Sequence, residues 1–357
     1  MIWLGRLLRW TPLALVPLAV GLAWFAPTWH KAIFFASVVA IMPLAGYIGR
    51  ATEDLAAQLG AGLGGLLNAT FGNAAELIIG ALALHRGLTD LVKASITGSI
   101  IGNVLLVFGA SALVGGIRHH TQRFNRTAAG MGTTMLLLSA IGLVVPAVFH
   151  RLARAYTARE LRLDTEIAVV LLLTYCASLV FTLKTHRHLF GAEEAREADE
   201  NLPSVRSSAL TLFAATAAVA VVSELLVDAV AQAAGSLRMS QLFVGVVIVA
   251  LVGNAAEHYS AVLMARRDKM DAAIGIAVGS STQIALFVAP VLVFLSYVIA
   301  PAPMDLLFTT FELVAIGLSV VSIAFIAHDG ETHWMEGVQL LAVYAILALG
   351  FYFLPAS

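Results

Sequence analysis

The chain has 357 residues, of which 60% are hydrophobic and only 12% are charged, and its formal net charge is −1. A soluble domain carries about 25% charged residues, so this composition excludes an ordinary soluble protein and predicts a polytopic helical membrane protein. The near-neutral charge gives no sign of a nucleic-acid partner. The single cysteine, Cys176, excludes a disulfide within the chain.

The apolar segments are long enough to cross a membrane about eleven times as helices of about 20 residues. None shows the alternating pattern of a membrane β-barrel, so the predicted fold class is all-α, with strands not expected. Arg6 and Arg9 precede the first apolar stretch, which lacks a clear cleavage site and is therefore predicted to be a retained helix entering from the cytoplasm. The predicted spans are residues 11–26, 32–49, 66–84, 94–116, 128–149, 164–183, 208–233, 241–265, 272–299, 306–327 and 336–354.

The longest polar interruption runs from Lys184 to Ser208 and contains the sequence EEAREADE. It is interpreted either as a solvated linker between two halves or as a cytoplasmic segment that attracts cations or regulates the protein. Alternating the spans from a cytoplasmic N-terminus places more Lys and Arg on the cytoplasmic side, although the Arg-rich loop 150–163 falls on the other side. The acidic residues of the segment are Glu193, Glu194, Glu197, Asp199 and Glu200.

The sequence GNAAE occurs twice, ending at Glu76 and at Glu257, and superposing the two copies also places Gly98-Ser99 on Gly279-Ser280. Two polar clusters in the same order and spacing indicate a duplicated half. An odd number of spans separates the two GNAAE helices, so the copies are predicted to cross the membrane in opposite directions, with interrupted helices at their contact, as in secondary transporters. The predicted interruptions lie near Gly64, Gly65, Gly72, Gly245 and Gly253. The predicted organisation is an additional N-terminal helix (1–29), a first five-helix repeat (30–183), a cytoplasmic acidic linker (184–207) and a second five-helix repeat (208–357).

Each GNAAE copy places an amide and an acid on one helix face, because Asn73 and Glu76 are three residues apart, as are Asn254 and Glu257. A charge at the bilayer centre costs at least about 2.5–3.5 kcal/mol, so these acids are expected to face a cavity or a partner. Neighbouring spans offer no Lys or Arg at comparable depth, and the predicted partner is therefore a bound cation or a proton. Adding the nearby amides and hydroxyls gives a predicted cation site of Asn73, Glu76, Ser99, Asn103, Asn254, Glu257, Ser280 and Gln283.

The chemistry of this set favours calcium, which prefers about six to eight oxygen ligands, and the lack of Cys or paired His argues against zinc. Two carboxylates neutralise one divalent ion, and desolvated carboxylates close together take up protons when the ion leaves. Structural roles for the acids and interhelical packing of the neutral residues are the alternatives. His258 is interpreted as a satisfied histidine or a proton relay, and Glu312 as a structural acid or part of a proton pathway.

A family resemblance is carried by the segments ATEDLAAQLGAGLGGLLNATFGNAAELIIG, GSIIGNVLLV, LKTHRHLF, VALVGNAAEHYSAV, GSSTQIALFVAP and DGETHWMEG. They closely resemble the cation/proton exchanger (CAX) family of calcium/proton antiporters, over nearly the whole chain after about residue 40. The resemblance implies a regulatory first helix, two inverted halves and an acidic cytoplasmic segment between them. It also implies ion binding by the GNAAE amides and acids, with the neighbouring polar positions close by. Gly102 departs from it, standing where the family sequence GSILSN has Ser.

The leading hypothesis is a calcium/proton antiporter of a prokaryotic cell membrane that exports Ca²⁺ from the cytoplasm by alternating access. The protein is not expected to be an enzyme or to need a cofactor. Its expected partners are membrane lipid, Ca²⁺ and protons, and the sequence leaves open whether it forms homo-oligomers. The nearest rival is a sodium/calcium exchanger, or another divalent-cation/proton exchanger, of the same superfamily. A cation channel is the rival from another class, distinguished by flux that is not coupled to a pH gradient. A membrane-embedded hydrolase would need a nucleophile and a general base, and His258 with Ser260 is not enough to indicate such a pair.

Overall fold

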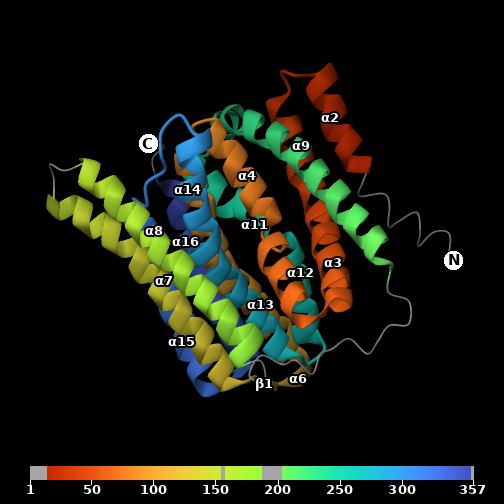
Figure 1. Ribbon diagram of the computed structural model, residues 1–357, viewed down its shortest axis with the longest axis vertical. Helices are drawn as coiled ribbons and strands as arrows, with labels where there is room; N and C mark the ends of the chain where they lie inside the picture. Colours follow the sequence, from red (N-terminus) through yellow and green to blue (C-terminus); the bar gives the residue numbers. More distant parts are fainter. Residues whose placement is uncertain (1–13, 154–156, 187–202, 355–357) are drawn as a thin grey trace.

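The computed structural model describes residues 14–153, 157–186 and 203–354, and the protein is almost entirely helical there (Figure 1). The acidic residues of the central segment, like Arg6 and Arg9, lie outside the described residues. The first part of the chain contains α2 (Leu15–Phe25), α3 (His30–Phe71), α4 (Ala74–His85), α5 (Thr89–Ile101), the π-helical segment η2 (Gly102–Val107), α6 (Phe108–His119), β1 (Thr121–Arg123), α7 (Arg126–Ala153), α8 (Thr157–Val180) and the π-helical segment η3 (Phe181–Thr185). The second part contains α9 (Val205–Leu237), α10 (Gln241–Phe243), the π-helical segment η5 (Val244–Val249), α11 (Ala250–Gly253), α12 (Ala255–Arg266), α13 (Met270–Gln283), the π-helical segment η6 (Ile284–Val288), α14 (Ala289–Ile299), α15 (Thr310–Asp329), β2 (Glu331–His333) and α16 (Trp334–Phe353).

The number and length of the apolar helices identify a multi-pass membrane protein. Within the described residues, eight helices are long and apolar enough to cross a membrane, or ten if each of two bent pairs forms one span. The bent pairs are Leu63–Phe71 with Ala74–His85 and Gln241–Gly253 with Ala255–Arg266, and α2 is a shorter apolar helix. This confirms the predicted all-α fold and comes close to the predicted number of spans.

Both spans that contain a GNAAE sequence are broken, and a further break precedes the first of them. Gly60 interrupts α3 with φ 81° and ψ 169°, a conformation that favours glycine. This break was not predicted, and α3 continues beyond the expected end near residue 49 because no turn sequence stops it before Gly60. The two bent pairs break at Asn73 and Asn254, directly after two of the predicted glycines, Gly72 and Gly253.

The two GNAAE helices run in opposite directions. The end of α4 meets the end of α14, with Nδ1 of His85 lying 3.2 Å from the carbonyl oxygen of Ile299. The end of α12 meets the end of α6, where Nε2 of His119 lies 3.2 Å from the carbonyl oxygen of Arg266. These two meeting points lie at opposite ends of the molecule, because α15, 20 residues and about 30 Å long, connects the segment after α14 to the loop beside α6. The predicted inverted repeat is therefore confirmed.

A small β-ribbon marks one of these ends. Three residues after α6 (Thr121–Arg123) pair antiparallel with three residues after α15 (Glu331–His333). The expectation of no strands is wrong at this point, because two loops that connect spans lie side by side and pair their backbones. The apolar spans themselves contain no strand within the described ranges.

The spans are arranged around a buried centre. Figure 1 shows α3 and α9 side by side with α2 against them on one flank, and α7, α8 and α15 on the other flank, with α4 and α11 to α13 between them. Among the eight unbroken spans of the described residues, the span of α5 to α6 is the most deeply buried, with 72% of an apolar 18-residue stretch inside the protein against 17% for α8. Gly98 allows this packing, because a Cβ atom there would overlap the carbonyl oxygen of Val246 in η5. Helix α5 is thus held at the centre, where the predicted site residues meet.

Candidate functional site

The two GNAAE acids occupy equivalent places in the fold. Glu76 lies in the first turn of α4, which bends by 41° from the helix before it, and Glu257 lies in the first turn of α12, which bends by 62°. Each acid follows the residue at the helix N-cap, Asn73 or Asn254, by three positions. The N-terminus of a helix carries a partial positive charge that stabilises a carboxylate at this position. The break in each span therefore holds an acid inside the protein.

The N-cap asparagines do not cap their helices. Asn at this position usually accepts a hydrogen bond from a backbone N–H two or three residues later, but neither Asn73 nor Asn254 does so. Nδ2 of Asn73 instead donates to Oε1 of Gln283 at 2.6 Å. Nδ2 of Asn254 donates to Oγ of Ser99 at 2.8 Å, and Nδ2 of Asn103 donates to Oδ1 of Asn254 at 3.1 Å. The amides of each half thus bond to the other half.

Among the residues that the structure describes, three buried oxygens at this place have no hydrogen-bond partner: Oε2 of Glu76, Oε2 of Glu257 and Oδ1 of Asn103. A buried polar atom without a partner is costly, and a buried charge without one is more so. The arrangement therefore needs a positive partner, which a cation or protons can provide.

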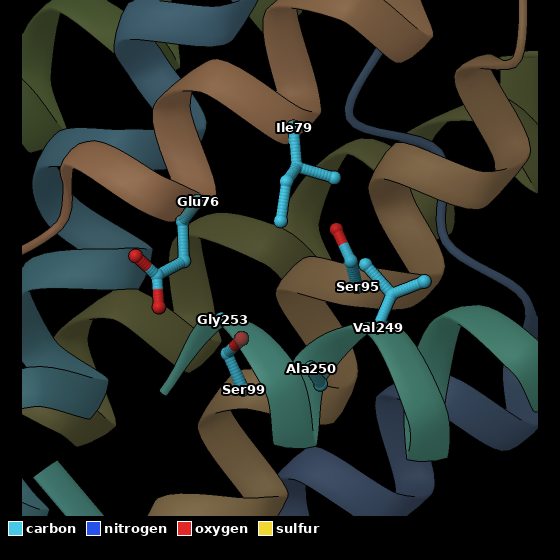
Figure 2. Close-up of a pocket in the computed structure, with 7 residues that line it drawn as sticks. All are labelled: Glu76, Ile79, Ser95, Ser99, Val249, Ala250 and Gly253. Atoms are coloured by element: carbon cyan, nitrogen blue, oxygen red, sulfur yellow. The ribbon is translucent and has the colours of Figure 1, made fainter. Parts of the chain in front are cut away.

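Figure 2 shows a small pocket beside Glu76, lined also by Ile79, Ser95, Ser99, Val249, Ala250 and Gly253. A Cβ atom at Gly253 would lie 3.0 Å from Oε1 of Glu76, so this glycine gives the carboxylate room. Ser95 was not predicted as a site residue. Its spacing was a usable signal, because it precedes Ser99 by one helical turn and so shares its face.

The structure brings most of the eight predicted residues together. Two hydrogen-bonded groups contain Asn73 with Gln283 and Asn254 with Ser99 and Asn103, while Glu76 shares a pocket with Ser99. Ser280 is buried on α13, but within the described part of the chain no side-chain hydrogen bond joins it to the other seven. Its neighbour Ser281 reaches across instead, donating to the carbonyl oxygen of Ile100 at 3.2 Å.

The two residues proposed for a proton pathway differ in their surroundings. His258 follows Glu257 directly on α12 and is partly buried. Glu312 is buried at the start of α15, where it forms a capping box with Thr309 and accepts a hydrogen bond from Thr97. The pocket beside Glu76 is not lined by Glu312.

The site differs from the usual resident metal centre of a protein. Within the described residues, no group of three or more His, Cys, Asp or Glu is arranged to hold a metal ion. A cation between Glu76 and Glu257 would depend on two carboxylates and on neutral oxygens. Ligand charge sets the affinity of calcium sites, so a site with two acids suits an ion that must also leave.

Oppositely directed broken helices that carry acids and amides at the contact of two repeats define a secondary transporter. The model of the sodium/calcium exchanger protein family matches residues 29–184 and 207–353. The chain belongs to this family.

Individual relatives resemble the chain over most of its length. The Ca(2+)/H(+) antiporter ChaA of Bacillus subtilis (strain 168) is 47% identical over 331 residues, which cover 91% of this chain and 93% of that protein. The Ca(2+)/H(+) antiporter of Synechocystis sp. is 41% identical, with 96% of each chain covered. The vacuolar calcium ion transporter of Schizosaccharomyces pombe is 42% identical and matches 96% of this chain and 84% of that protein.

Solved structures share the fold. The structure of native YfkE superposes with a TM-score of 0.84 at 44% identity, covering 97% of this chain and 99% of that chain. The crystal structure of the H+/Ca2+ exchanger CAX superposes with a TM-score of 0.73 over 97% of this chain and 92% of that chain. Its identity is 13%, so the likeness concerns the fold alone.

Proposed function

We propose that the protein is a calcium/proton antiporter that moves Ca²⁺ out of the cytoplasm in exchange for protons by alternating access. The observation that carries the proposal is the pair of half-buried acids, Glu76 and Glu257, each of which has one buried oxygen without a partner among the described residues, beside a network of amides from both halves. The names of the Bacillus subtilis and Synechocystis relatives, both Ca(2+)/H(+) antiporters, support the choice of ions. These bacterial relatives also support a place in a prokaryotic cell membrane.

In this mechanism Glu76 and Glu257 serve two ligands in turn. One Ca²⁺ neutralises both carboxylates, and without it two protons do so. Because the same oxygens bind calcium or protons, occupation by one excludes the other, which is the condition for exchange. When calcium leaves, the negative charge of the two carboxylates is costly inside the protein unless protons replace the ion. The transporter therefore rarely has both acids empty and ionised, and this suppresses its return without protons.

The amides and hydroxyls join the two halves beside the acids and add neutral oxygens. Asn103 contributes an unpartnered Oδ1, and Asn73 is oriented by Gln283. We assign the cation site to Asn73, Glu76, Ser99, Asn103, Asn254, Glu257, Ser280 and Gln283. His258 stays a candidate proton relay because it adjoins Glu257 on α12.

The proposal requires neither enzymatic activity nor a resident cofactor. It treats residues 30–183 and 208–357 as the two repeats, 1–29 as an additional helix and 184–207 as a cytoplasmic acidic linker. The repeats would rock against each other around the site between them. Whether copies of the chain associate plays no part in this mechanism.

Calcium uptake into proteoliposomes under an imposed pH gradient tests the function. Purified protein should accumulate Ca²⁺ when the lumen is acidic relative to the outside, and the accumulation should collapse when the pH gradient is dissipated. A sodium gradient without a pH gradient is the control. Uptake driven by sodium alone would replace the proposal with a sodium/calcium exchanger, and calcium flux that ignores both gradients would indicate a channel.

A further inference from the structure

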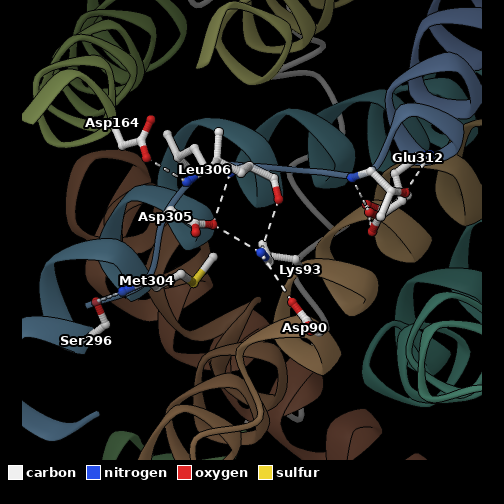
Figure 3. Close-up of polar contacts among 11 residues, drawn as sticks. Asp90, Lys93, Asp164, Ser296, Met304, Asp305, Leu306 and Glu312 are labelled. Carbon is white, nitrogen blue, oxygen red and sulfur yellow. Dashed lines mark hydrogen bonds and ion pairs between the residues drawn. The ribbon is translucent and has the colours of Figure 1, made fainter. Parts of the chain in front are cut away.

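A row of polar contacts fixes one face of α5 to residues 304–312 (Figure 3). Nζ of Lys93 donates to Oδ1 of Asp305 at 3.0 Å and to the carbonyl oxygen of Leu307 at 3.1 Å. One helical turn further along, Oγ1 of Thr97 donates to Oε1 of Glu312 at 3.0 Å. Lys93 and Thr97 are four residues apart and therefore lie on the same face of α5. The segment 304–312 thus runs along this face and contacts it twice.

Other helices anchor this segment in turn. The backbone N–H of Met304 donates to Oγ of Ser296 on α14 at 2.7 Å. The backbone N–H of Leu306 donates to Oδ2 of Asp164 on α8 at 3.2 Å, and Asp164 is only 1% exposed. The contacts on α5 therefore come from a segment that is itself held at two points, so they can restrain α5.

Glu312 is fully engaged at the end of this row. Its Oε2 accepts from the backbone N–H of Thr309 at 2.8 Å, while its own N–H donates to Oγ1 of Thr309 at 3.3 Å. Its Oε1 is the acceptor for Thr97. Glu312 is only 2% exposed, both of its carboxylate oxygens are bonded to these threonines, and it does not line the pocket beside Glu76. The carboxylate joins the start of α15 to α5.

Thr97 lies close to the ion site but on the other side of its helix. Thr97 and Ser99 are two residues apart, which places their side chains about 200° apart around α5. Thr97 contacts Glu312, while Ser99 accepts a hydrogen bond from Asn254. Helix α5 is therefore held between α15 on one face and the broken span of Asn254 on the other. A small rotation or shift of α5 would move Ser99 and Asn103 together.

We infer that Glu312 is a positioning residue, which sets α5 through Thr97 so that Ser99 and Asn103 meet Asn254, rather than part of a proton pathway. The inference deepens the proposed function and rests on it for the transport readout. It resolves the two interpretations of Glu312 that the sequence left open in favour of the structural acid. Glu312 is then not among the acids that exchange protons for calcium.

The test uses four variants in proteoliposomes: Thr97→Val, Thr97→Ser, Glu312→Gln and the double variant of Thr97→Val with Glu312→Gln. For each, the KM for calcium, the maximal rate and the number of protons exchanged per calcium are measured. Thr97→Val removes the donor and should raise the KM by about three- to tenfold, the loss expected for one buried hydrogen bond. Thr97→Ser keeps the hydroxyl and should stay close to the original protein. The number of protons per calcium should be the same in all variants.

The double variant identifies the contact. Thr97→Val removes the hydrogen bond between Thr97 and Glu312, and Glu312→Gln weakens it, so the loss in the double variant should be smaller than the product of the two single losses. Losses that multiply would overturn the inference, as would a lower proton count in Glu312→Gln. If Glu312→Gln does not fold, the comparison of Thr97→Val with Thr97→Ser decides alone, and equal KM values in these two variants would reject the inference.

A second readout does not depend on transport. Hydrogen–deuterium exchange in calcium-free detergent should be faster at the amides of residues 97–103 in Thr97→Val than in Thr97→Ser, with α8 unchanged. Unchanged exchange there would also contradict the inference. If the original protein failed to exchange calcium for protons, the proposed function would fail, whereas this measurement would still report on the contact between Glu312 and α5.

Discussion

Asn73 and Gln283 are 210 residues apart in the chain, yet Nδ2 of Asn73 donates to Oε1 of Gln283 at 2.6 Å. The bond joins the break before α4 to the end of α13. On the other side of the site, Asn254 is joined to Ser99 and Asn103 of α5 and η2. The two halves are therefore cross-connected by amides next to the two acids, and this leads to predictions about each group.

Replacing Gln283 with Ala removes the acceptor for Asn73. A buried amide left without its partner costs about 1–3 kcal/mol, so the KM for calcium should rise by about five- to 150-fold. Transport assays over a range of calcium concentrations measure this effect. Gln232→Ala, on the exposed surface of α9, is the control and should change nothing. Equal KM values in the two variants would exclude Gln283 from the site.

Glu76→Gln and Glu257→Gln should each abolish exchange while the protein stays folded. Each carboxylate would form a charge pair with bound Ca²⁺. Removing one partner of such a buried pair costs about 3–5 kcal/mol, which corresponds to more than a hundredfold weaker calcium binding. Calorimetric calcium binding and proteoliposome flux measure it, with thermal unfolding as the check on folding. Glu166→Gln, an exposed residue paired with Arg162, is the matched control. A folded variant at either site residue with normal transport would remove that acid from the mechanism.

Gly253→Ala should weaken calcium binding by about tenfold without unfolding the protein. The added Cβ would lie 3.0 Å from Oε1 of Glu76, so the carboxylate has to move from its place in the pocket. Gly275→Ala on α13 is the control, because a Cβ there meets nothing within 4 Å. Since Ala also favours a helix over Gly by about 0.5–1 kcal/mol, neither variant should be less stable for intrinsic reasons. Equal calcium affinities of the two variants would show that Glu76 does not need this space.

Calcium binding should depend on pH because calcium and protons share Glu76 and Glu257. At high pH both acids are ionised and affinity should be greatest; as pH falls they take up protons and affinity should decrease. Each calcium that binds should release protons, approaching two per ion when only these acids titrate. Isothermal calorimetry in buffers of different ionisation enthalpy measures both quantities. Desolvated acids take up protons at a higher pH than a free Glu does, so affinity that stays flat from about pH 6 to about pH 9, with no proton release, would defeat the shared site.

The acidic segment, which lies outside the described residues, gives a prediction that separates its two interpretations. Changing Glu193, Glu194, Glu197, Asp199 and Glu200 to neutral residues should leave coupled transport intact if the segment only links the halves. If it attracts calcium, the same change should raise the apparent KM at low ionic strength while the maximal rate survives, since salt screens such attraction. Complete loss of flux by a correctly inserted variant would contradict both interpretations.

The sequence predicts the spans well because the membrane imposes length and apolarity on every helix. It also predicts the placement of the two acids, because each GNAAE copy puts Glu76 or Glu257 three residues after the Asn at which its span breaks. The break at Gly60 could not be predicted from composition alone, because glycines are frequent in this stretch and only tertiary packing selects the one that turns. The short ribbon beside α6 was missed for a similar reason: its strands pair two loops that are distant in sequence.

The pairing of the site residues was also beyond the sequence. Asn followed by Glu three residues later is the spacing of a helix cap, and local rules would assign Asn73 and Asn254 to capping their own helices. Their side chains turn to the other half because it offers Gln283 and Ser99 as partners, which only the folded chain brings near. Glu312 shows the opposite case. Its spacing from Thr309 is that of a capping box, and there the local rule is obeyed.

The crossed amides also bear on how the chain is made. When the ribosome has completed the first half, Gln283 has not been synthesised, so Asn73 must wait inside the membrane without the partner that it has in the finished protein. A polar group in that position favours contact with water or with the insertion machinery over release into lipid. The first half is therefore expected to remain unfinished until the second half arrives. If the two halves were produced as separate fragments, neither would mature alone, and co-expression would restore both.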